Sequence, residues 1–238
     1  MKKKTLFVTG GGSGLGAELV RAAHSRGHHV LCTGRRAIAD LPSDFPDLPY
    51  LSCDLASAGG AQVTADWVQS HLSGRRVDCA LLNAAAGYFR PLSAETPEAI
   101  SEVLTLNLDA NIVLAHRLSG NLEGGTLALI GSVAHKGAAG MPVYSASKAA
   151  LDGFGRALAQ EWRGRVAVRV LHPGPIATGM SARAGRKVDL ADRLFLSPRL
   201  MARIILDAAL APRGRDRQII GYLRALRGQI LPLGRQAA

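Results

Sequence analysis

Residues 5–16 of the 238-residue chain read TLFVTGGGSGLG, and this stretch decides the fold class. A short β-rich run ends in a glycine loop, and a helical pattern of apolar residues follows as far as Arg26-Gly27. Glycines let the backbone turn sharply and approach a pyrophosphate, whose charge is stabilised by the N-terminus of the following helix. The order of strand, glycine loop and helix therefore predicts a nucleotide-binding site near the start of the chain.

The remainder of the chain repeats this alternation of strand and helix. Apolar or β-branched runs that predict strands recur at residues 29–33, 50–53, 77–82, 127–130, 166–171 and 218–220. Helical patterns lie between several of them, at residues 61–72, 97–118 and 144–162. This alternation predicts an α/β fold of the Rossmann type, with a doubly wound, mostly parallel seven-stranded sheet and right-handed crossovers. We expect residues 1–238 to form a single domain.

Two arginines follow the second predicted strand, in the segment Gly34-Arg35-Arg36. An acidic residue at this place would receive the ribose hydroxyls of NAD. Guanidinium groups instead suit a 2′-phosphate, through charge-assisted and bidentate hydrogen bonds. The sequence therefore predicts NADP(H) as cofactor in preference to NAD(H). The alternative, two solvated arginines in a loop, is weakened by the missing carboxylate.

Tyr144 and Lys148 are four residues apart, which places them on one face if a helix begins at Tyr144. The three small residues between them are expected to leave that face open to a ligand. An ammonium about 4 Å from a phenol favours the phenolate by roughly 4 kcal/mol at an effective dielectric of ~20, which brings a tyrosine into the range useful for proton transfer. Ser132 ends a predicted strand, so its hydroxyl is expected at the sheet edge where ligands bind.

With these motifs in this order, the chain resembles the classical short-chain dehydrogenases/reductases, from about Thr5 to Thr178. The segments that are similar to family motifs are Thr9-Gly10-x-x-x-Gly14-x-Gly16 (the cofactor loop), Tyr144-x-x-x-Lys148 (the active-site signature) and Pro173-Gly174 with Thr178 (the segment that closes over the nicotinamide). The resemblance implies a carbonyl or alcohol oxidoreductase in which the cofactor carries the hydride.

Carried over residue by residue, the resemblance implies four catalytic residues. Tyr144 is the general acid/base, and Lys148 lowers its pKa and holds the nicotinamide ribose. Ser132 hydrogen-bonds the substrate oxygen, and Asn107 positions a water in a proton relay behind Lys148. The implied cofactor-binding residues are Thr9, Gly10, Gly12, Ser13, Gly14, Leu15, Gly16, Arg35, Arg36, Asp54 and Leu55 (at the adenine), Asn83 and Ala84 (at the ribose), Tyr144, Lys148, Pro173, Gly174, Ile176 and Thr178.

The chain departs from the family pattern at a few places. Leu82-Asn83-Ala84-Ala85 stands where the family usually has Asn-Asn-Ala-Gly, and the interval from Ser132 to Tyr144 is one residue short. The glycine-rich loop at residues 135–141 can absorb the shorter interval. His135 and His172 follow predicted strands and invite a catalytic role, but single histidines at strand ends are usually structural.

Two segments near the C-terminus are expected to act around the substrate. Residues 179–196 would cover it and, with Tyr88, Phe89 and Met141, form a mostly apolar pocket with a cationic rim. Hydrophobic ketones and substrates with an acidic group both remain open. The tail at residues 221–238 has leucines and an isoleucine on one helical face, so it could cover a lipophilic substrate, pack against another subunit or lie on an anionic membrane. Packing within the protein is favoured over membrane contact.

Composition limits the remaining classes. The net charge is +11, and residues 164–238 hold 14 of the 29 Lys and Arg but only 4 of the 18 Asp and Glu. This excess could mark an acidic partner or an arginine-rich surface, but no nucleic-acid recognition motif accompanies it. Three cysteines without metal-ligand spacing favour reduced core residues, no metal site and a cytoplasmic protein. No apolar run approaches the ~20 residues of a membrane span.

The resemblance also implies a homodimer or homotetramer, assembled through the helices at residues 97–118 and 144–162. The leading alternative function is a catalytically silent protein that senses NADP(H) or acts as a scaffold on the same fold. The intact set of Asn107, Ser132, Tyr144 and Lys148 argues against it, since a sensor needs no proton relay.

Overall fold

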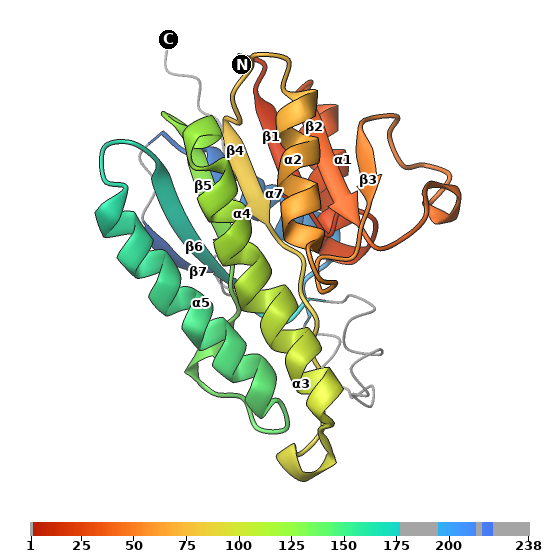
Figure 1. The fold of residues 1–238 in the computed structure, drawn as a ribbon, viewed down its shortest axis with the longest axis vertical. Helices are drawn as coiled ribbons and strands as arrows, with labels where there is room; N and C mark the ends of the chain where they lie inside the picture. The colour runs from red at the N-terminus through yellow and green to blue at the C-terminus, as the bar shows by residue number, and fades with distance from the viewer. Residues whose placement is uncertain (1, 177–194, 213–215, 221–238) are drawn as a thin grey trace.

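The computed structural model describes residues 2–176, 195–212 and 216–220, which form one seven-stranded sheet covered by helices (Figure 1). The strands are β1 (Thr5–Thr9), β2 (His29–Gly34), β3 (Tyr50–Ser52), β4 (Cys79–Leu82), β5 (Thr126–Ile130), β6 (Ala167–Pro173) and β7 (Arg217–Ile220). Their order is β3-β2-β1-β4-β5-β6-β7, and every pair is parallel. The predicted doubly wound Rossmann-type sheet of seven strands is confirmed.

The strand order reverses between β1 and β4. From β1 the chain builds outward to β2 and β3, and it then returns to place β4 on the opposite side of β1. In open parallel sheets the crevice at such a reversal, beyond the carboxyl ends of the strands, is where ligands bind. The glycine loop leaves β1 at this point.

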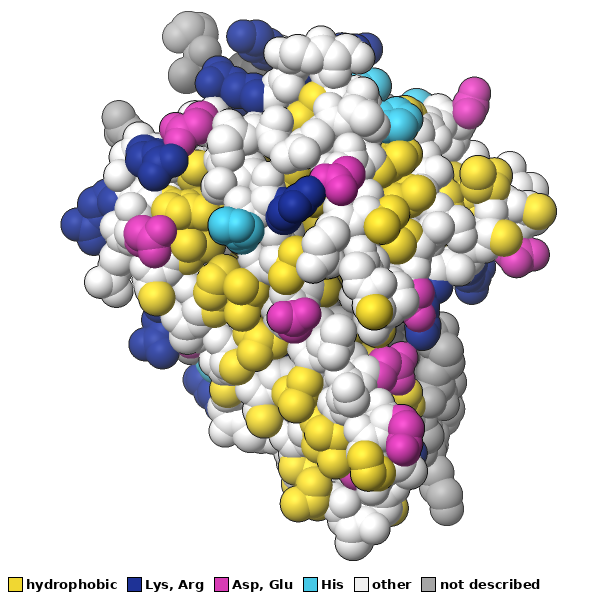
Figure 2. All heavy atoms as spheres, viewed as in Figure 1, with side chains coloured by type: hydrophobic (Ala, Val, Ile, Leu, Met, Phe, Trp, Pro, Cys, Tyr) yellow, Lys and Arg dark blue, Asp and Glu magenta, His cyan; other side chains and the backbone are white. Residues whose placement is uncertain are grey.

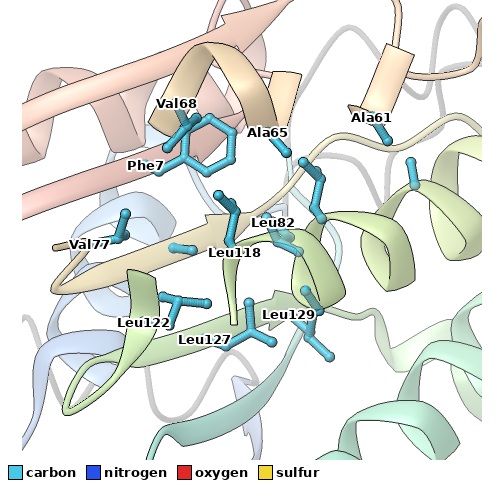
Figure 3. Close-up of a cluster of buried hydrophobic side chains, with 14 of the residues drawn as sticks. Phe7, Ala61, Ala65, Val68, Val77, Leu82, Leu118, Leu122, Leu127 and Leu129 are labelled. Atoms are coloured by element: carbon cyan, nitrogen blue, oxygen red, sulfur yellow. The ribbon is translucent and has the colours of Figure 1, made fainter. Parts of the chain in front are cut away.

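Alternation along the strands divides the core into two layers. Phe7 of β1 packs with helices on one face of the sheet, whereas its neighbours Leu6 and Val8 pack on the other. The first layer holds α2 (Gly60–His71), α3 (Pro97–Leu104), α4 (Ala110–Leu118) and α5 (Pro142–Glu161), and the second holds α1 (Gly14–Ser25) and α7 (Pro198–Leu210) (Figure 1). Figure 3 shows Phe7 of the first layer beside Val68 of α2, with Leu118 and Leu127 below.

The predicted helix at residues 97–118 is interrupted. The chain follows α3, a π-helical turn, η3 (Thr105–Asp109), and then α4. Asn107 lies fully buried in the centre of this turn. Such single π turns often occur at functional sites, and hydrophobic periodicity did not reveal this one because the apolar face continues across it.

Helix α7 was not predicted. It begins with Ser197 as N-cap, whose hydroxyl accepts from the Leu200 amide at 3.2 Å, and Pro198 occupies the first turn. Met201, Ile205 and their neighbours bury one face against α1. The cap, the proline and this spacing are together a helix-start signal that the sequence carries.

Short helical turns complete the described residues. They are η1 (Ile38–Asp40), η2 (Leu92–Ala94), η4 (Gly120–Leu122) and η5 (Val133–Lys136). No helix in the described part of the chain is long and apolar enough to cross a membrane. The predicted tail at residues 221–238 and most of the predicted covering segment at 179–196 lie outside the described residues.

Candidate active site

The glycine loop makes a close turn between β1 and α1. Gly10 has a φ of +68°, a left-handed conformation that favours glycine. A Cβ placed on Gly16 would lie 2.0 Å from the carbonyl oxygen of Gly10, so no side chain fits there. The turn therefore leaves backbone amides exposed at the N-terminus of α1, as an anion site requires.

Thr9 and Asn83 tie the ends of β1 and β4 together. The Thr9 hydroxyl accepts from the amides of Asn83 and Ala84 at 2.9 and 3.0 Å, and the Asn83 side chain donates to the Thr9 carbonyl at 3.1 Å. These bonds hold the two strand ends at the position where the strand order reverses. Thr9 thus supports the site from beneath it.

A cavity of about 710 Å³ opens beside the glycine loop, and most of the predicted site residues line it. The predicted residues in its wall are Gly10, Gly12, Ser13, Gly14, Leu15, Gly16, Arg35, Arg36, Leu55, Asn83, Ala84, Ser132, Tyr144, Lys148, Pro173, Gly174 and Ile176. The fold thus brings together residues as far apart in the sequence as Gly10 and Ile176.

Three predicted residues lie outside this wall. Asp54 lines a neighbouring hollow with Glu98 and Glu102, and its carboxylate accepts from the Ala56 amide at 2.9 Å. Thr9 and Asn107 lie behind the wall, where they hold backbone. Thr178 lies outside the described residues.

Tyr144 and Lys148 share one face of α5, as predicted from their spacing. The Lys148 ammonium lies 5.7 Å from the centre of the Tyr144 ring. Lys148 is only 2% exposed, and its Nζ donates to the Ile130 carbonyl at 2.9 Å. Helix α5 itself begins two residues earlier than predicted, at Pro142.

The pKa values of this pair are set mainly by burial. Burial lowers the pKa of Lys148 to about 8. Burial raises the pKa of Tyr144, and a side-chain hydrogen bond with Ser132 opposes that rise. Desolvation of the phenol sets the direction of the Tyr144 pKa, and the lowering by Lys148 stays a prediction. Tyr144 is therefore a neutral phenol that can donate a proton.

Ser132 stands directly beyond β5, at the carboxyl edge where it was predicted. It caps η5, and its hydroxyl accepts from the Ala134 amide at 3.1 Å. The same hydroxyl bonds the Tyr144 side chain. Two oxygens that could both contact one substrate oxygen are therefore already adjacent.

Asn107 uses its side chain within the protein. Its amide oxygen accepts from the Ala86 amide at 2.9 Å, and its nitrogen donates to the Ala86 carbonyl and to Ser147 at 2.8 and 2.9 Å. Ser147 in turn donates to the Tyr144 carbonyl at 2.7 Å. Asn107 thereby joins the π-helical turn to the segment after β4 and to the turn of α5 that begins with Tyr144.

Tyr144 and Lys148 both line the cavity, so the face that they share is open to a ligand as expected, but the small residues between them do not form the opening. Ser145 and Ser147 are buried, and the Ser145 hydroxyl accepts from the Ala138 amide at 3.0 Å. A Cβ on Gly87 would lie 2.6 Å from the Tyr144 ring, so another segment packs closely there. The small residues serve close packing of α5, and ligand access comes instead from the side of the glycine loop.

Arg35 and Arg36 lie at the end of β2 and line the cavity, as predicted. The Arg35 guanidinium also pairs with Glu102 of α3 at 3.2 Å, and that carboxylate accepts a hydrogen bond from the Tyr88 hydroxyl. The carboxylate missing after β2 is thus supplied from a distant helix. Tyr88 is not among the cavity residues, whereas Phe89, Met141 and Phe195 are, as predicted.

Several cavity residues were not predicted, namely Gly34, Cys53, Ala85, Leu106, Ile130, Gly131, Val133, Ala134, Gly137, Ala138 and Pro175. Most of them adjoin predicted residues at strand ends, so extending each strand end by one or two residues would have found them. Gly137 and Ala138 come from the loop before α5, and no local signal in the sequence points to them. Among the described residues, no cluster of His, Cys, Asp and Glu is arranged to hold a metal ion.

Comparison with known proteins agrees with this geometry. A family model described as short chain dehydrogenase matches residues 4–189. Carbonyl reductase family member 4 of Danio rerio is 34% identical over 186 residues, which cover 74% of this chain and 76% of that protein. The 3-oxoacyl-[acyl-carrier-protein] reductase of Homo sapiens is 32% identical over 191 residues, which cover 75% and 78%. A solved short chain dehydrogenase from Burkholderia cenocepacia in complex with NADP is 25% identical, with a TM-score of 0.76 and coverage of 99% of this chain and 95% of that one.

Proposed function

The chain belongs to the classical short-chain dehydrogenase/reductase family, and from this premise we propose that it is an NADP(H)-dependent oxidoreductase that interconverts a ketone or aldehyde and the corresponding alcohol. The observation that carries the proposal is the convergence of Ser132, Tyr144 and Lys148 on the cavity beside the glycine loop. These three side chains can polarise a carbonyl oxygen, protonate it and hold the charge that results.

The residues around the glycine loop fit a dinucleotide cofactor, which supplies the hydride when bound. The close packing of Gly16 against the Gly10 carbonyl holds the glycine loop in a tight turn, and the loop lines the cavity. Lys148 has three ammonium N–H groups. Among the described residues, its hydrogen bond to the Ile130 carbonyl uses one of them. The amides at the start of α1 would hold the pyrophosphate, and Lys148 would hold the nicotinamide ribose.

In the reductive direction Tyr144 gives its proton to the substrate oxygen, while the Ser132 hydroxyl hydrogen-bonds the same oxygen. Burial keeps the phenol neutral near pH 7, which is the form that this step needs. The buried Lys148 ammonium stabilises the phenolate that remains. We retain Asn107 as part of the proton relay, and its bonds to Ala86 and Ser147 support a role in holding the relay's walls.

The preference for NADP(H) rests on Arg35 and Arg36, which lie where the 2′-phosphate of a bound cofactor would be expected. We expect the double variant Arg35→Ala, Arg36→Ala to weaken NADPH binding far more than NADH binding, because only NADPH loses a phosphate contact. Calorimetric titration of both nucleotides measures this difference. Equal losses for the two nucleotides would refute the phosphate assignment.

The substrate end of the cavity favours an apolar carbonyl compound. Phe89, Val133, Met141, Ile176 and Phe195 are among the residues that line the cavity together with Ser132. Apolar walls with a few polar groups at the reacting atom are typical of small-molecule sites. We therefore propose hydrophobic ketones as the substrate class. The arginine-rich residues expected at the rim, which would favour an acidic group, lie mostly outside the described residues.

A panel of hydrophobic ketones and aldehydes, read as NADPH consumption, tests this function. We expect turnover on some of them, and Tyr144→Phe should abolish it while NADPH affinity is largely kept, because the phenol proton is needed only for chemistry. Turnover by Tyr144→Phe at nearly the wild-type rate would contradict the mechanism. NADPH binding without turnover across the panel would instead favour the sensor or scaffold.

We also propose that the protein assembles as a homodimer or homotetramer. Leu104 and Ile112 are exposed on the helices that the family uses for assembly, and Figure 2 shows hydrophobic side chains gathered over this face. Sedimentation equilibrium measures the oligomeric state directly, and a monomer at all concentrations would contradict the proposal.

We also propose a cytoplasmic location. It is supported by Cys32, Cys53 and Cys79, none of which forms a disulfide.

A further inference from the structure

His172 at the end of β6 lies between two acceptors and is completely buried. Its Nε2 lies 2.9 Å from a carboxylate oxygen of Asp152 in α5. Its Nδ1 lies 3.1 Å from the backbone carbonyl of Ser132. One imidazole thus connects a buried acid to the backbone of the serine proposed to bind the substrate oxygen.

The two contacts of His172 limit the protonation states that the His172–Asp152 pair can have. A neutral imidazole has one N–H and one lone pair, and an ionised carboxylate and a carbonyl can only accept. Both contacts are attractive only if the His172–Asp152 pair carries one proton more than a neutral imidazole and a carboxylate together. Whether that proton is nearer His172 or Asp152, Nδ1 then donates to Ser132. Without it, a hydrogen on Nε2 leaves the Nδ1 lone pair facing the Ser132 carbonyl.

The surroundings hold the ring in this place. The His135 ring stacks on it with centres 4.0 Å apart, and its own Nδ1 lies 2.7 Å from the same Ser132 carbonyl. A Cβ on Gly131 would lie 2.5 Å from Nδ1 of His172, so only glycine lets the imidazole approach the chain here. Two imidazoles therefore fix one peptide group, whose side-chain hydroxyl faces Tyr144.

Resting on the proposed function, we propose that His172 is a positioning residue for Ser132, and that carbonyl reduction requires the extra proton of the His172–Asp152 pair. When the proton is present, Nδ1–H anchors the Ser132 carbonyl and directs the hydroxyl towards Tyr144. When it is lost, that anchor becomes a repulsive contact. The positioning is therefore present at low pH and lost as the pH rises through the pKa of the pair.

The charged groups around the pair are few among the described residues. From α5, Arg156 contacts the other carboxylate oxygen of Asp152 at 3.3 Å, and Lys148 donates to Ile130. From η5, His135 faces the ring and Lys136 is exposed. The β7 neighbour in register is the uncharged Ile219. Burial lowers the pKa of His172, and the bond from Asp152 opposes that shift.

Two variants separate positioning from simple stabilisation. His172→Phe keeps a ring in the stack but removes Nδ1–H, and we expect kcat to fall about 10- to 100-fold while calorimetric NADPH affinity is unchanged. Asp152→Asn can donate its amide N–H to Nε2 and present its oxygen to Arg156. It therefore holds the neutral imidazole with its proton on Nδ1, without a titrating carboxylate.

We expect Asp152→Asn to retain turnover and to lose the part of the decline of kcat with pH that comes from the His172–Asp152 pair, while the part that comes from Lys148 remains. Wild-type kcat in His172→Phe, or the same pH profile in Asp152→Asn and wild type, would overturn the proposal. Nitrogen NMR of protein labelled at histidine measures the protonation of Nδ1 independently of turnover. Nδ1 of His172 should lose its proton as the pH rises in the wild type and keep it in Asp152→Asn. An Nδ1 without a proton throughout the range in the wild type overturns the proposal, whatever the protein's activity.

Discussion

Two Lys or Arg side chains are buried among the residues that the structure describes, and their surroundings differ. Arg169 in β6 is 4% exposed, and it donates to three backbone carbonyls at the C-terminal end of α7, those of Ala208, Ala209 and Ala211, at 2.6, 3.0 and 2.5 Å. Lys148 at the carboxyl edge is 2% exposed and donates to the single carbonyl of Ile130. Burial lowers the pKa of both.

The difference separates support of the fold from support of a ligand. The planar fork of Arg169 meets the unpaired carbonyls and the negative end of a helix dipole, so its charge is compensated within the fold. Lys148 donates to one carbonyl in the described part of the chain and keeps hydrogen-bonding capacity towards the cavity. A buried charge with incomplete compensation is costly to the folded state and is typical of a site whose ligand completes it.

Removing the charge of Lys148 tests whether this cation supports a ligand, and we expect the largest effect, on kcat/KM, from this change. We expect Lys148→Met to lower kcat/KM by about 10²- to 10⁴-fold, because the phenolate loses its counter-charge. The free energy of unfolding at pH 7 should be no lower than that of the wild type, since an apolar side chain of similar length removes the cost of burying the charge. Steady-state kinetics and denaturant unfolding measure the two quantities, and wild-type kinetics would contradict the assignment.

Removing the charge of Arg169 tests whether this cation supports the fold. We expect Arg169→Met to lower the free energy of unfolding by about 3 kcal/mol, because three buried carbonyls lose their donors. For a protein of this size that corresponds to a melting temperature roughly 10 °C lower. Turnover per folded molecule should be unchanged. Arg169→Lys is the matched control, and it should recover only part of the loss because a point charge cannot meet all three carbonyls.

The pH dependence of stability sharpens the comparison. The pKa of Lys148 falls from an ordinary 10.5 to about 8 on folding, so burial destabilises the charged form below pH 8 and the penalty disappears by pH 10.5. Relative to Lys148→Met, the wild type should gain up to about 3 kcal/mol as the pH rises across this window. Denaturant unfolding of both proteins between pH 7 and pH 10 checks the sign. A constant difference would mean that Lys148 is not desolvated.

The pair between Arg35 and Glu102 is more exposed, and we expect the smallest effect there. A 2′-phosphate must compete with Glu102 for the Arg35 guanidinium. Glu102→Gln should therefore tighten NADPH binding by at most about fivefold, as expected for an exposed ion pair, and leave NADH binding unchanged. Calorimetric titration measures both affinities. Weaker NADPH binding in this variant would show that Glu102 instead holds Arg35 in its binding position.

The sequence predicts the sheet and the positions of Ser132, Tyr144 and Lys148 because these depend on local patterns. Strand-ending residues gather at one edge of any parallel sheet, and i and i+4 share a helix face. The partners of Arg169 could not be predicted without α7, and the pair between Arg35 and Glu102 joins segments that no pattern connects.

Burial explains the remaining differences at the site. A spacing argument places Lys148 near Tyr144, but it does not say how much water surrounds the two groups. Desolvation therefore sets the direction of the tyrosine pKa, which the spacing alone does not reveal. The same absence of burial information made His172 look like an ordinary strand-end histidine, although it contacts Asp152 and the Ser132 backbone.

Calorimetric titration of the wild type and Lys148→Met with NADPH, in buffers of different ionisation enthalpy, tests the central claim most directly. We predict that the wild type binds NADPH in preference to NADH and takes up a proton on binding above pH 8, because the bound nucleotide accepts hydrogen bonds from the charged ammonium. Lys148→Met should bind without this uptake. Failure of the wild type to bind either nucleotide, or equal proton uptake in both proteins, would contradict the account.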